Sequence, residues 1–114
     1  MAKIIFLGLD GSDRATEILA NSLQQRGHDT EVLVHPNHIW EKISNSDLLV
    51  IWGDGKSLVK MLHNILKKSQ TIRILYLHTN KRLAPKFSCD RFHTLPVAEK
   101  KSIVINLILE ILEK

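Results

Sequence analysis

Short, almost wholly apolar segments alternate along this chain with longer amphipathic ones, and this alternation most constrains the fold. We expect the apolar segments to be strands, and they are residues 3–9, 30–34, 47–52, 72–77 and, at an edge, 92–95. Between them, apolar residues recur at three- and four-residue spacing, as the buried face of a helix requires, in residues 14–26, 37–44, 56–68 and 97–113. Strands that alternate with helices form parallel sheets covered on both faces. The sequence therefore predicts an α/β fold, a three-layer flavodoxin-like (Rossmannoid) sandwich whose parallel sheet of four or five strands has the order 2-1-3-4-5.

The length and composition fit one globular unit. The 114 residues suit a single α/β domain spanning 1–114, and 44% hydrophobic with 25% charged residues excludes a disordered chain. Cys89 is the only cysteine, so no internal disulfide forms and we expect a cytoplasmic location. No apolar run has the roughly 18 residues that crossing a membrane takes, so no membrane is expected as a partner.

Charge is distributed unevenly between the two halves of the chain. Residues 1–57 carry 5 basic and 8 acidic side chains, whereas residues 58–114 carry 11 basic and 4 acidic ones. A small anionic ligand or a polyanionic partner suits this asymmetry, and so does a basic surface that only keeps the protein in solution. The basic stretch at residues 81–91 contains Phe87 as its single aromatic residue and no zinc or helix-turn-helix pattern, so nucleic acid is not the expected partner.

Polar, glycine-containing loops follow the predicted strands, at the carboxyl edge where open parallel sheets bind ligands. Helices that begin near Ser12 and Ser57 direct free N–H groups to this edge, which favours a phosphate or another anion. Asp10 or Asp54 would contact ribose hydroxyls or Mg²⁺. Trp52 would either stack on a base or be a core residue. The predicted ligand-binding residues are Asp10, Gly11, Ser12, Trp52, Asp54, Gly55, Lys56, Ser57 and Thr79.

Patterns for catalysis and metal binding are incomplete. Residues 55–57 match the end of a P-loop, but the first glycine of that motif would stand at position 50, where this chain has Val50. His35, His38 and His78 fall on the carboxyl edge without a regular ligand spacing, so we expect no metal site there. The sequence identifies no catalytic residue and leaves enzymatic activity open.

The last predicted helix, residues 97–113, is apolar over most of its surface. Its polar residues form one narrow stripe, made of Ser102, Asn106, Glu110 and Glu113. Covering a sheet takes only about a third of a helix surface. The surplus apolar residues would therefore seal a homodimer or lie deeper between neighbouring elements. The homodimer hypothesis predicts that Ile105→Asp or Leu109→Asp separates the two copies without unfolding them.

Three nucleotide-related families resemble parts of the chain. Residues 46–57, SDLLVIWGDGKS, resemble a segment of SLOG-superfamily nucleotide-binding proteins and are similar in placement to a strand and loop of nucleoside deoxyribosyltransferases. Residues 15–52 resemble TIR domains in the order of helix, strand and Ser-Asp before an apolar strand. These resemblances imply a nucleotide or nucleotide-sugar ligand at the carboxyl edge. The helix glutamate that catalysis requires in the last two families is absent from residues 56–68, so binding is implied and catalysis is not.

Response-regulator receiver domains provide a competing resemblance. Thr79 follows the fourth predicted strand and Leu95-Pro96 precedes the last helix, where that family has Thr and Lys-Pro. The phosphoacceptor aspartate of the family would stand at Trp52, and its lysine at Leu95. This resemblance implies a degenerate receiver that contacts proteins without being phosphorylated.

Two functions of different classes follow from these observations. The leading hypothesis is a small cytosolic Rossmann-like signalling module that binds a nucleotide or a nucleotide-derived anion, with Mg²⁺ as an optional cofactor. The alternative is a phosphorylation-independent, receiver-like interaction domain that forms a homodimer through the 97–113 helix.

Overall fold

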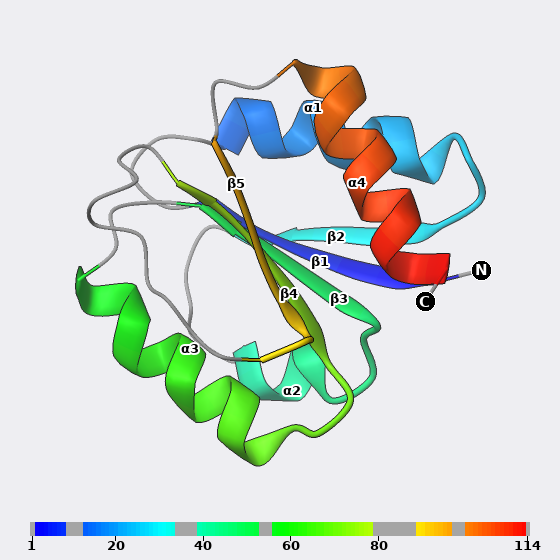
Figure 1. The fold of residues 1–114 in the computed structure, drawn as a ribbon. Helices are drawn as coiled ribbons and strands as arrows, with labels where there is room; N and C mark the ends of the chain where they lie inside the picture. The colour runs from blue at the N-terminus through cyan, green and yellow to red at the C-terminus, as the bar shows by residue number, and fades with distance from the viewer. Residues whose placement is uncertain are drawn as a thin grey trace.

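The computed structural model describes residues 2–8, 13–33, 39–52, 56–78, 89–96 and 100–113, with the backbone alone for residues 13–15 and 56–58. Its strands form a parallel five-stranded sheet in the order β2-β1-β3-β4-β5, which confirms the predicted topology (Figure 1). The strands are β1 (Lys3–Gly8), β2 (Asp29–Leu33), β3 (Leu48–Trp52), β4 (Arg73–His78) and β5 (Phe92–Pro96). The helices are α1 (Asp13–Gln24), α2 (Ile39–Ile43), α3 (Lys56–Lys68) and α4 (Lys101–Glu113).

Helices cover both faces of the sheet, with α1 and α4 on one face and α2 and α3 on the other (Figure 1). Side chains of a strand alternate between the two faces. Phe6 and Val50 therefore join the core beneath α1 and α4, whereas Ile5 and Leu49 join the core beneath α2 and α3. All four are fully buried. Burial on both faces explains why the central strands are continuous apolar runs in the sequence.

Gly27 ends α1, as the sequence predicts. Its φ of +93° lies in the left-handed region that glycine adopts without strain. The Gly27 N–H donates to the Gln24 carbonyl at 3.0 Å, and the His28 N–H donates to the Leu23 carbonyl at 3.2 Å. These two bonds form a Schellman motif, which ends the helix at Gln24, two residues before the predicted boundary.

Two other helices differ at their ends from the prediction. Helix α2 is the five-residue segment Ile39–Ile43, while residues 37 and 38 lie outside the described part of the chain and Ser44 follows the helix. Helix α4 begins at Lys101; Lys100 precedes it, and residues 97–99 lie outside the described ranges. None of the helices described is both long and apolar enough to cross a membrane.

Two arginines cap helix C-termini at the edge of the sheet where the strands begin. The Arg91 guanidinium donates to the carbonyl oxygens of Ser69 at 2.6 Å and Leu66 at 3.0 Å, at the end of α3. The Arg73 guanidinium donates to the Ile111 carbonyl near the end of α4. Carbonyls in the last turn of a helix have no partner within the helix and carry partial negative charge, so both cations stabilise the helix ends.

Candidate functional site

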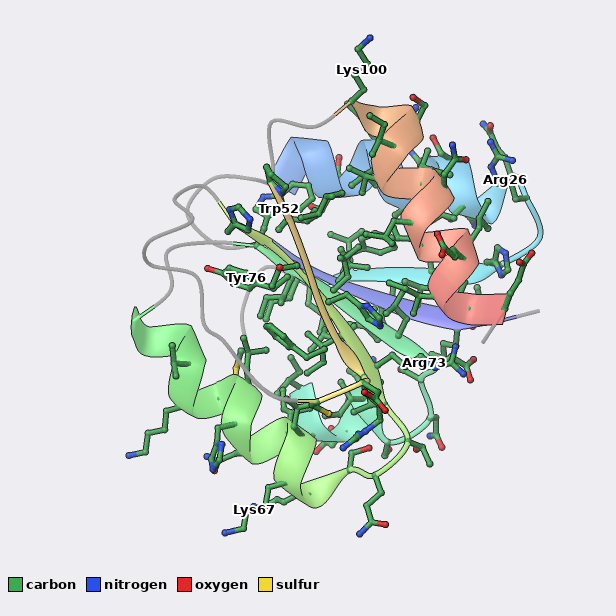
Figure 2. All side chains as sticks on the ribbon, in the orientation of Figure 1. Arg26, Trp52, Lys67, Arg73, Tyr76 and Lys100 are labelled. Atoms are coloured by element: carbon green, nitrogen blue, oxygen red, sulfur yellow. The ribbon has the colours of Figure 1, made fainter. Side chains whose placement is uncertain are left out.

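An apolar row of side chains crosses the carboxyl edge of the sheet. In the sheet register, Gly8 pairs with Trp52 and Trp52 pairs with Leu77. Leu77 pairs in turn with Leu95. Registered neighbours point to the same face of a sheet, and here it is the face that α1 and α4 cover. Trp52, which is labelled in Figure 2, is 3% exposed. Leu77 is 1% exposed, and Leu95 is half-buried against the same core.

This row determines which functional groups stand at the ends of β3 and β5. The receiver resemblance implies an aspartate at position 52 and a lysine at position 95. The indole of Trp52 and the hydrocarbon of Leu95 supply neither an oxygen nucleophile nor a ligand for Mg²⁺ nor a positive charge. In this chain the side chains at both positions contribute to the core.

Most of the predicted anion-binding residues lie outside the described part of the chain. Trp52 is described, and its ring belongs to the core, so stacking on a base would require it to leave that cluster. Lys56 and Ser57 begin α3, which has no acidic residue in its first turn. The positive end of this helix lies at the carboxyl edge, as the prediction requires. The predicted residues outside the described ranges are Asp10, Gly11, Ser12, Asp54, Gly55 and Thr79.

Val50, which stands where a P-loop has its first glycine, is fully buried in the middle of β3 and pairs with Phe6 and Leu75. Over the described residues, no group of three or more His, Cys, Asp and Glu side chains is placed to hold a metal ion. His78 is almost buried at the end of β4, while His35 and His38 lie outside the described ranges.

Helix α4 exposes different residues from those that the sequence pattern suggested. Ile105 is only 5% exposed and Leu109 is half-buried, and both pack in the core beneath α1 and α4. Ile105→Asp is therefore unsuitable for separating two folded copies, because it places a carboxylate in the core. Ile103, by contrast, is 42% exposed, and Leu107 is half-buried one turn further along. We call Ile103 and Leu107 the α4 apolar edge.

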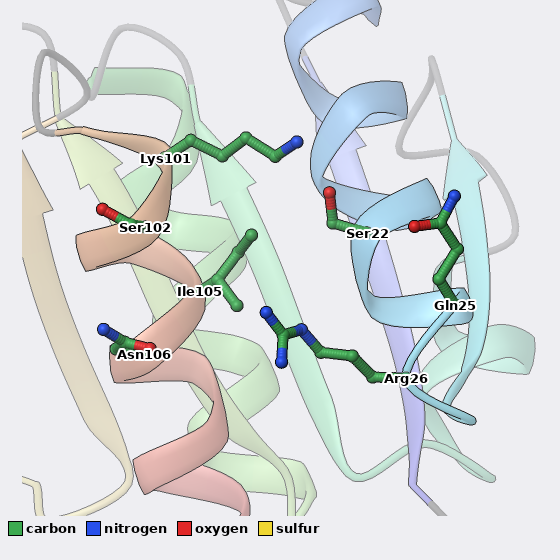
Figure 3. Close-up of a pocket in the computed structure, with 7 residues that line it drawn as sticks. All are labelled: Ser22, Gln25, Arg26, Lys101, Ser102, Ile105 and Asn106. Carbon is green, nitrogen blue, oxygen red and sulfur yellow. The ribbon is translucent and has the colours of Figure 1, made fainter.

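A hollow of about 450 Å³ lies between α1 and α4, and the sequence pattern did not reveal it (Figure 3). Its signal in the sequence is a cation at the end of one predicted helix, Arg26, and a second cation early in another, Lys101. Only the topology places both helices on the same face of the sheet. We call this hollow the α1–α4 groove. The residues that line it are Ser22, Gln25, Arg26, Lys101, Ser102, Ile105 and Asn106.

Comparison with known proteins finds no matching family model and no matching curated protein. Solved structures do match. The response regulator TrrA from Thermotoga maritima, in complex with Mg²⁺-BeF, is 18% identical with a TM-score of 0.72, covering 97% of this chain and 99% of its own. A two-component response regulator from Clostridium difficile is also 18% identical, with a TM-score of 0.70, and the match covers 100% of this chain and 98% of that one. A structure of TrrA in complex with the histidine kinase ThkA gives 18% identity and a TM-score of 0.68, and the match covers 97% of this chain and 98% of that one.

These comparisons favour one of the resemblances in the sequence over the others. The matching structures named above are response regulators, while the resemblance to SLOG, deoxyribosyltransferase and TIR proteins is not supported. At such low identity the likeness concerns the path of the backbone and the order of the strands. This chain therefore has the flavodoxin-like fold of response-regulator receiver domains.

Proposed function

We propose that this chain is a receiver-like protein-interaction domain that works without phosphorylation of an aspartate. The observation that carries the proposal is the buried indole of Trp52 at the end of β3, in the place of the phosphoacceptor. Leu95, at the end of β5, replaces the lysine that the receiver resemblance implies. The chain therefore has the fold of a receiver domain, but apolar residues at the two positions where a receiver has its phosphoacceptor and its lysine.

The chemistry of phosphoryl transfer supports this function. A carboxylate that accepts a phosphoryl group must reach solvent, and the transferred group needs positive charge around its oxygens. Trp52, Leu77 and Leu95 form a continuous apolar row at this edge and supply none of these groups. A receiver-like fold that lacks the groups for phosphorylation can still bind proteins through its outer surface.

A direct test treats the purified chain with acetyl phosphate and Mg²⁺ and measures the intact mass. We expect no phosphoryl group to be added. TrrA from Thermotoga maritima, which was solved with Mg²⁺-BeF, is the matched positive control. Acid-stable, hydroxylamine-sensitive phosphorylation of an aspartate in this chain would contradict the proposal.

The partner that we propose is a second copy, bound through α4. Ile103 is 42% exposed on a helix whose other apolar residues pack against the core, and Leu107 extends the α4 apolar edge by one turn. An exposed apolar side chain beside a half-buried one on the next turn favours association, because covering them removes hydrocarbon from water. In the ThkA complex named above, TrrA binds a histidine kinase, so a protein partner of another kind is the alternative occupant.

Sedimentation equilibrium over a range of concentrations tests the homodimer. We expect a monomer–dimer equilibrium that Ile103→Asp shifts to monomer. Val59→Asp is the matched control, because Val59 is 38% exposed on α3, which covers the opposite face of the sheet. A monomer at every concentration, or equal effects of both variants, would contradict self-association through α4.

A cytoplasmic location and a single domain are further parts of the proposal. The only cysteine, Cys89, is a free, half-buried thiol, which suits a reducing compartment. Two cores on the two faces of one sheet favour a single folding unit over residues 1–114. Cell fractionation checks the location, and a single cooperative urea transition checks the domain.

A further inference from the structure

Two cationic side chains reach into the α1–α4 groove from opposite sides. Figure 3 shows Lys101 extending from the start of α4 toward α1, and Arg26 extending from the end of α1 toward Ile105. Within the described residues, neither head group has an ion-pair or hydrogen-bond partner. Both charges are therefore available to a group that enters the groove.

The other five lining residues are polar except for Ile105, and none of them carries a negative charge. None of the seven residues is acidic. Gln25, Ser102 and Asn106 contribute two amides and a hydroxyl, whereas the Ser22 hydroxyl donates within its own helix to the Ile18 carbonyl at 3.1 Å. Ile105, 5% exposed, supplies an apolar floor. Such a lining offers hydrogen-bond donors and positive charge to an anion.

The start of α4 adds to this preference. Lys100 and Lys101 stand at the N-terminus of the helix, and its first turn contains no acidic residue. Cations are unfavourable at the positive end of a helix dipole, so a bound anion would relieve an existing repulsion. A second hollow, of about 350 Å³, contrasts with this one, because Asp47 and Glu113 line it together with Arg73. Its charges are mixed, so it has no comparable preference for an anion.

We propose that the α1–α4 groove binds an acidic segment of a protein partner. A glutamate or aspartate would place its carboxylate against the Arg26 guanidinium and the Lys101 ammonium, and its methylene groups against Ile105. No aromatic residue lines the groove, so the base of a nucleotide would find no side chain to stack on. The inference rests on the proposed function as an interaction domain, and it adds the chemistry of a second kind of partner, distinct from the copy bound through α4.

The test is an NMR titration of the isotope-labelled chain with a hexaglutamate peptide that has blocked termini. We expect saturable shifts confined to the backbone amides of the groove residues, and weaker binding at higher salt. In the double variant Arg26→Gln/Lys101→Gln the affinity should fall about tenfold or more. Both side chains are exposed, so the variant should keep the dispersed spectrum of a folded chain.

The matched control is Lys60→Gln/Lys67→Gln, which removes the same charge from the exposed face of α3, on the other side of the sheet. Figure 2 shows Lys67 pointing away from the body of the molecule. The control should bind the peptide as well as the unaltered chain. Shifts centred on α3, equal weakening by both double variants, or no binding would overturn the inference. Equal or tighter binding of inorganic phosphate at the same residues would also overturn it, in favour of a free anion.

Failure of this inference is distinguishable from failure of the proposed function. A chain that takes no phosphoryl group and does not bind hexaglutamate loses the groove assignment alone. A chain that is phosphorylated on an aspartate loses the proposed function, whatever the groove binds.

Discussion

Trp52 and Leu95 lie in the same registered row of the sheet, two strands apart, with Leu77 between them. In a receiver, these two positions would hold a negative and a positive side chain that meet at the phosphorylation site. Here they face the core that α1 and α4 cover, and the row is held together by hydrophobic contact. The backbone topology is that of receiver domains, whereas the side chains at these two positions are apolar.

Placing an aspartate at position 52 should unfold the chain rather than create a phosphorylation site. Trp52→Asp removes a buried indole and buries a carboxylate beside Leu77, which we expect to lower the free energy of unfolding by more than about 3 kcal/mol. Trp52→Phe keeps an aromatic ring and should cost about 1–2 kcal/mol. Urea unfolding followed by circular dichroism measures both. A folded Trp52→Asp variant that accepts a phosphoryl group would contradict this expectation.

The contact of Arg91 with the end of α3 should contribute measurably to stability. Its guanidinium donates to the carbonyls of Leu66, Ser69 and Ile72, at 3.0, 2.6 and 3.0 Å. Arg91→Met leaves these acceptors without their donor, and we expect a loss of about 2 kcal/mol in the free energy of unfolding. Lys67→Met, on the exposed face of α3, is the control and should change stability by less than about 0.5 kcal/mol. Similar losses for the two variants would show that the contact is not what stabilises this region.

Two isoleucines of α4, two positions apart, should differ strongly in how much stability the same substitution costs. Ile105→Asp buries a charge in the core and should cost more than about 3 kcal/mol. Ile103→Asp changes an exposed side chain and should alter the free energy of unfolding of the monomer by less than about 0.5 kcal/mol. Thermal unfolding at low protein concentration checks the pair. A large loss in Ile103→Asp would mean that this side chain is needed for folding and not for association.

An anion site at the carboxyl edge remains a prediction of the sequence. If a nucleotide binds there, a thermal-shift screen with nucleotides, NAD, ADP-ribose, cyclic dinucleotides and Mg²⁺ will raise the melting temperature. A ligand at 100 times its Kd adds about 2.7 kcal/mol, a shift of roughly 10 °C in a domain of this size. Lys56→Ala and Ser57→Ala should reduce that shift. No response to any ligand of the panel would end the nucleotide hypothesis.

The ion pair between Lys42 of α2 and Glu31 of β2 should make a small, pH-dependent contribution. The Lys42 ammonium lies 2.8 Å from the Glu31 carboxylate, and the hydrogen bond with Glu31 raises the pKa of Lys42 above its usual 10.5. A raised pKa in the folded state means stability that is fully present below 10.5 and lost as the pH rises past the folded value. Glu31→Gln should therefore lower the urea midpoint slightly at neutral pH and have no effect once Lys42 is deprotonated. A difference that persists in strong alkali would assign the effect to packing.

Local patterns were sufficient for most of the fold. Alternating apolar runs and amphipathic segments predicted the parallel sheet, because strands that alternate with helices form parallel sheets. The flavodoxin-like arrangement of such units predicted the strand order, which the structure confirms. Gly27 marked the end of α1, because a glycine after an amphipathic segment supplies the left-handed residue of a Schellman motif. The predicted start of α4 was less accurate, because helix ends depend on capping contacts as well as on periodicity.

By itself, the sequence determined the fold class, because the order of apolar and amphipathic segments along the chain is enough to predict it. It also determined that positions 52 and 95 are apolar, because the residues there are read directly. It did not determine which apolar residues of α4 face solvent, since Ile103 and Ile105 are indistinguishable by hydropathy. Nor did it bring Arg26 and Lys101 together. Their helices become neighbours only because the helix after β1 and the helix after β5 pack on the same face of the sheet. Contacts between distant segments depend on packing in three dimensions, so the groove and the exposed edge of α4 were decided by the tertiary structure alone.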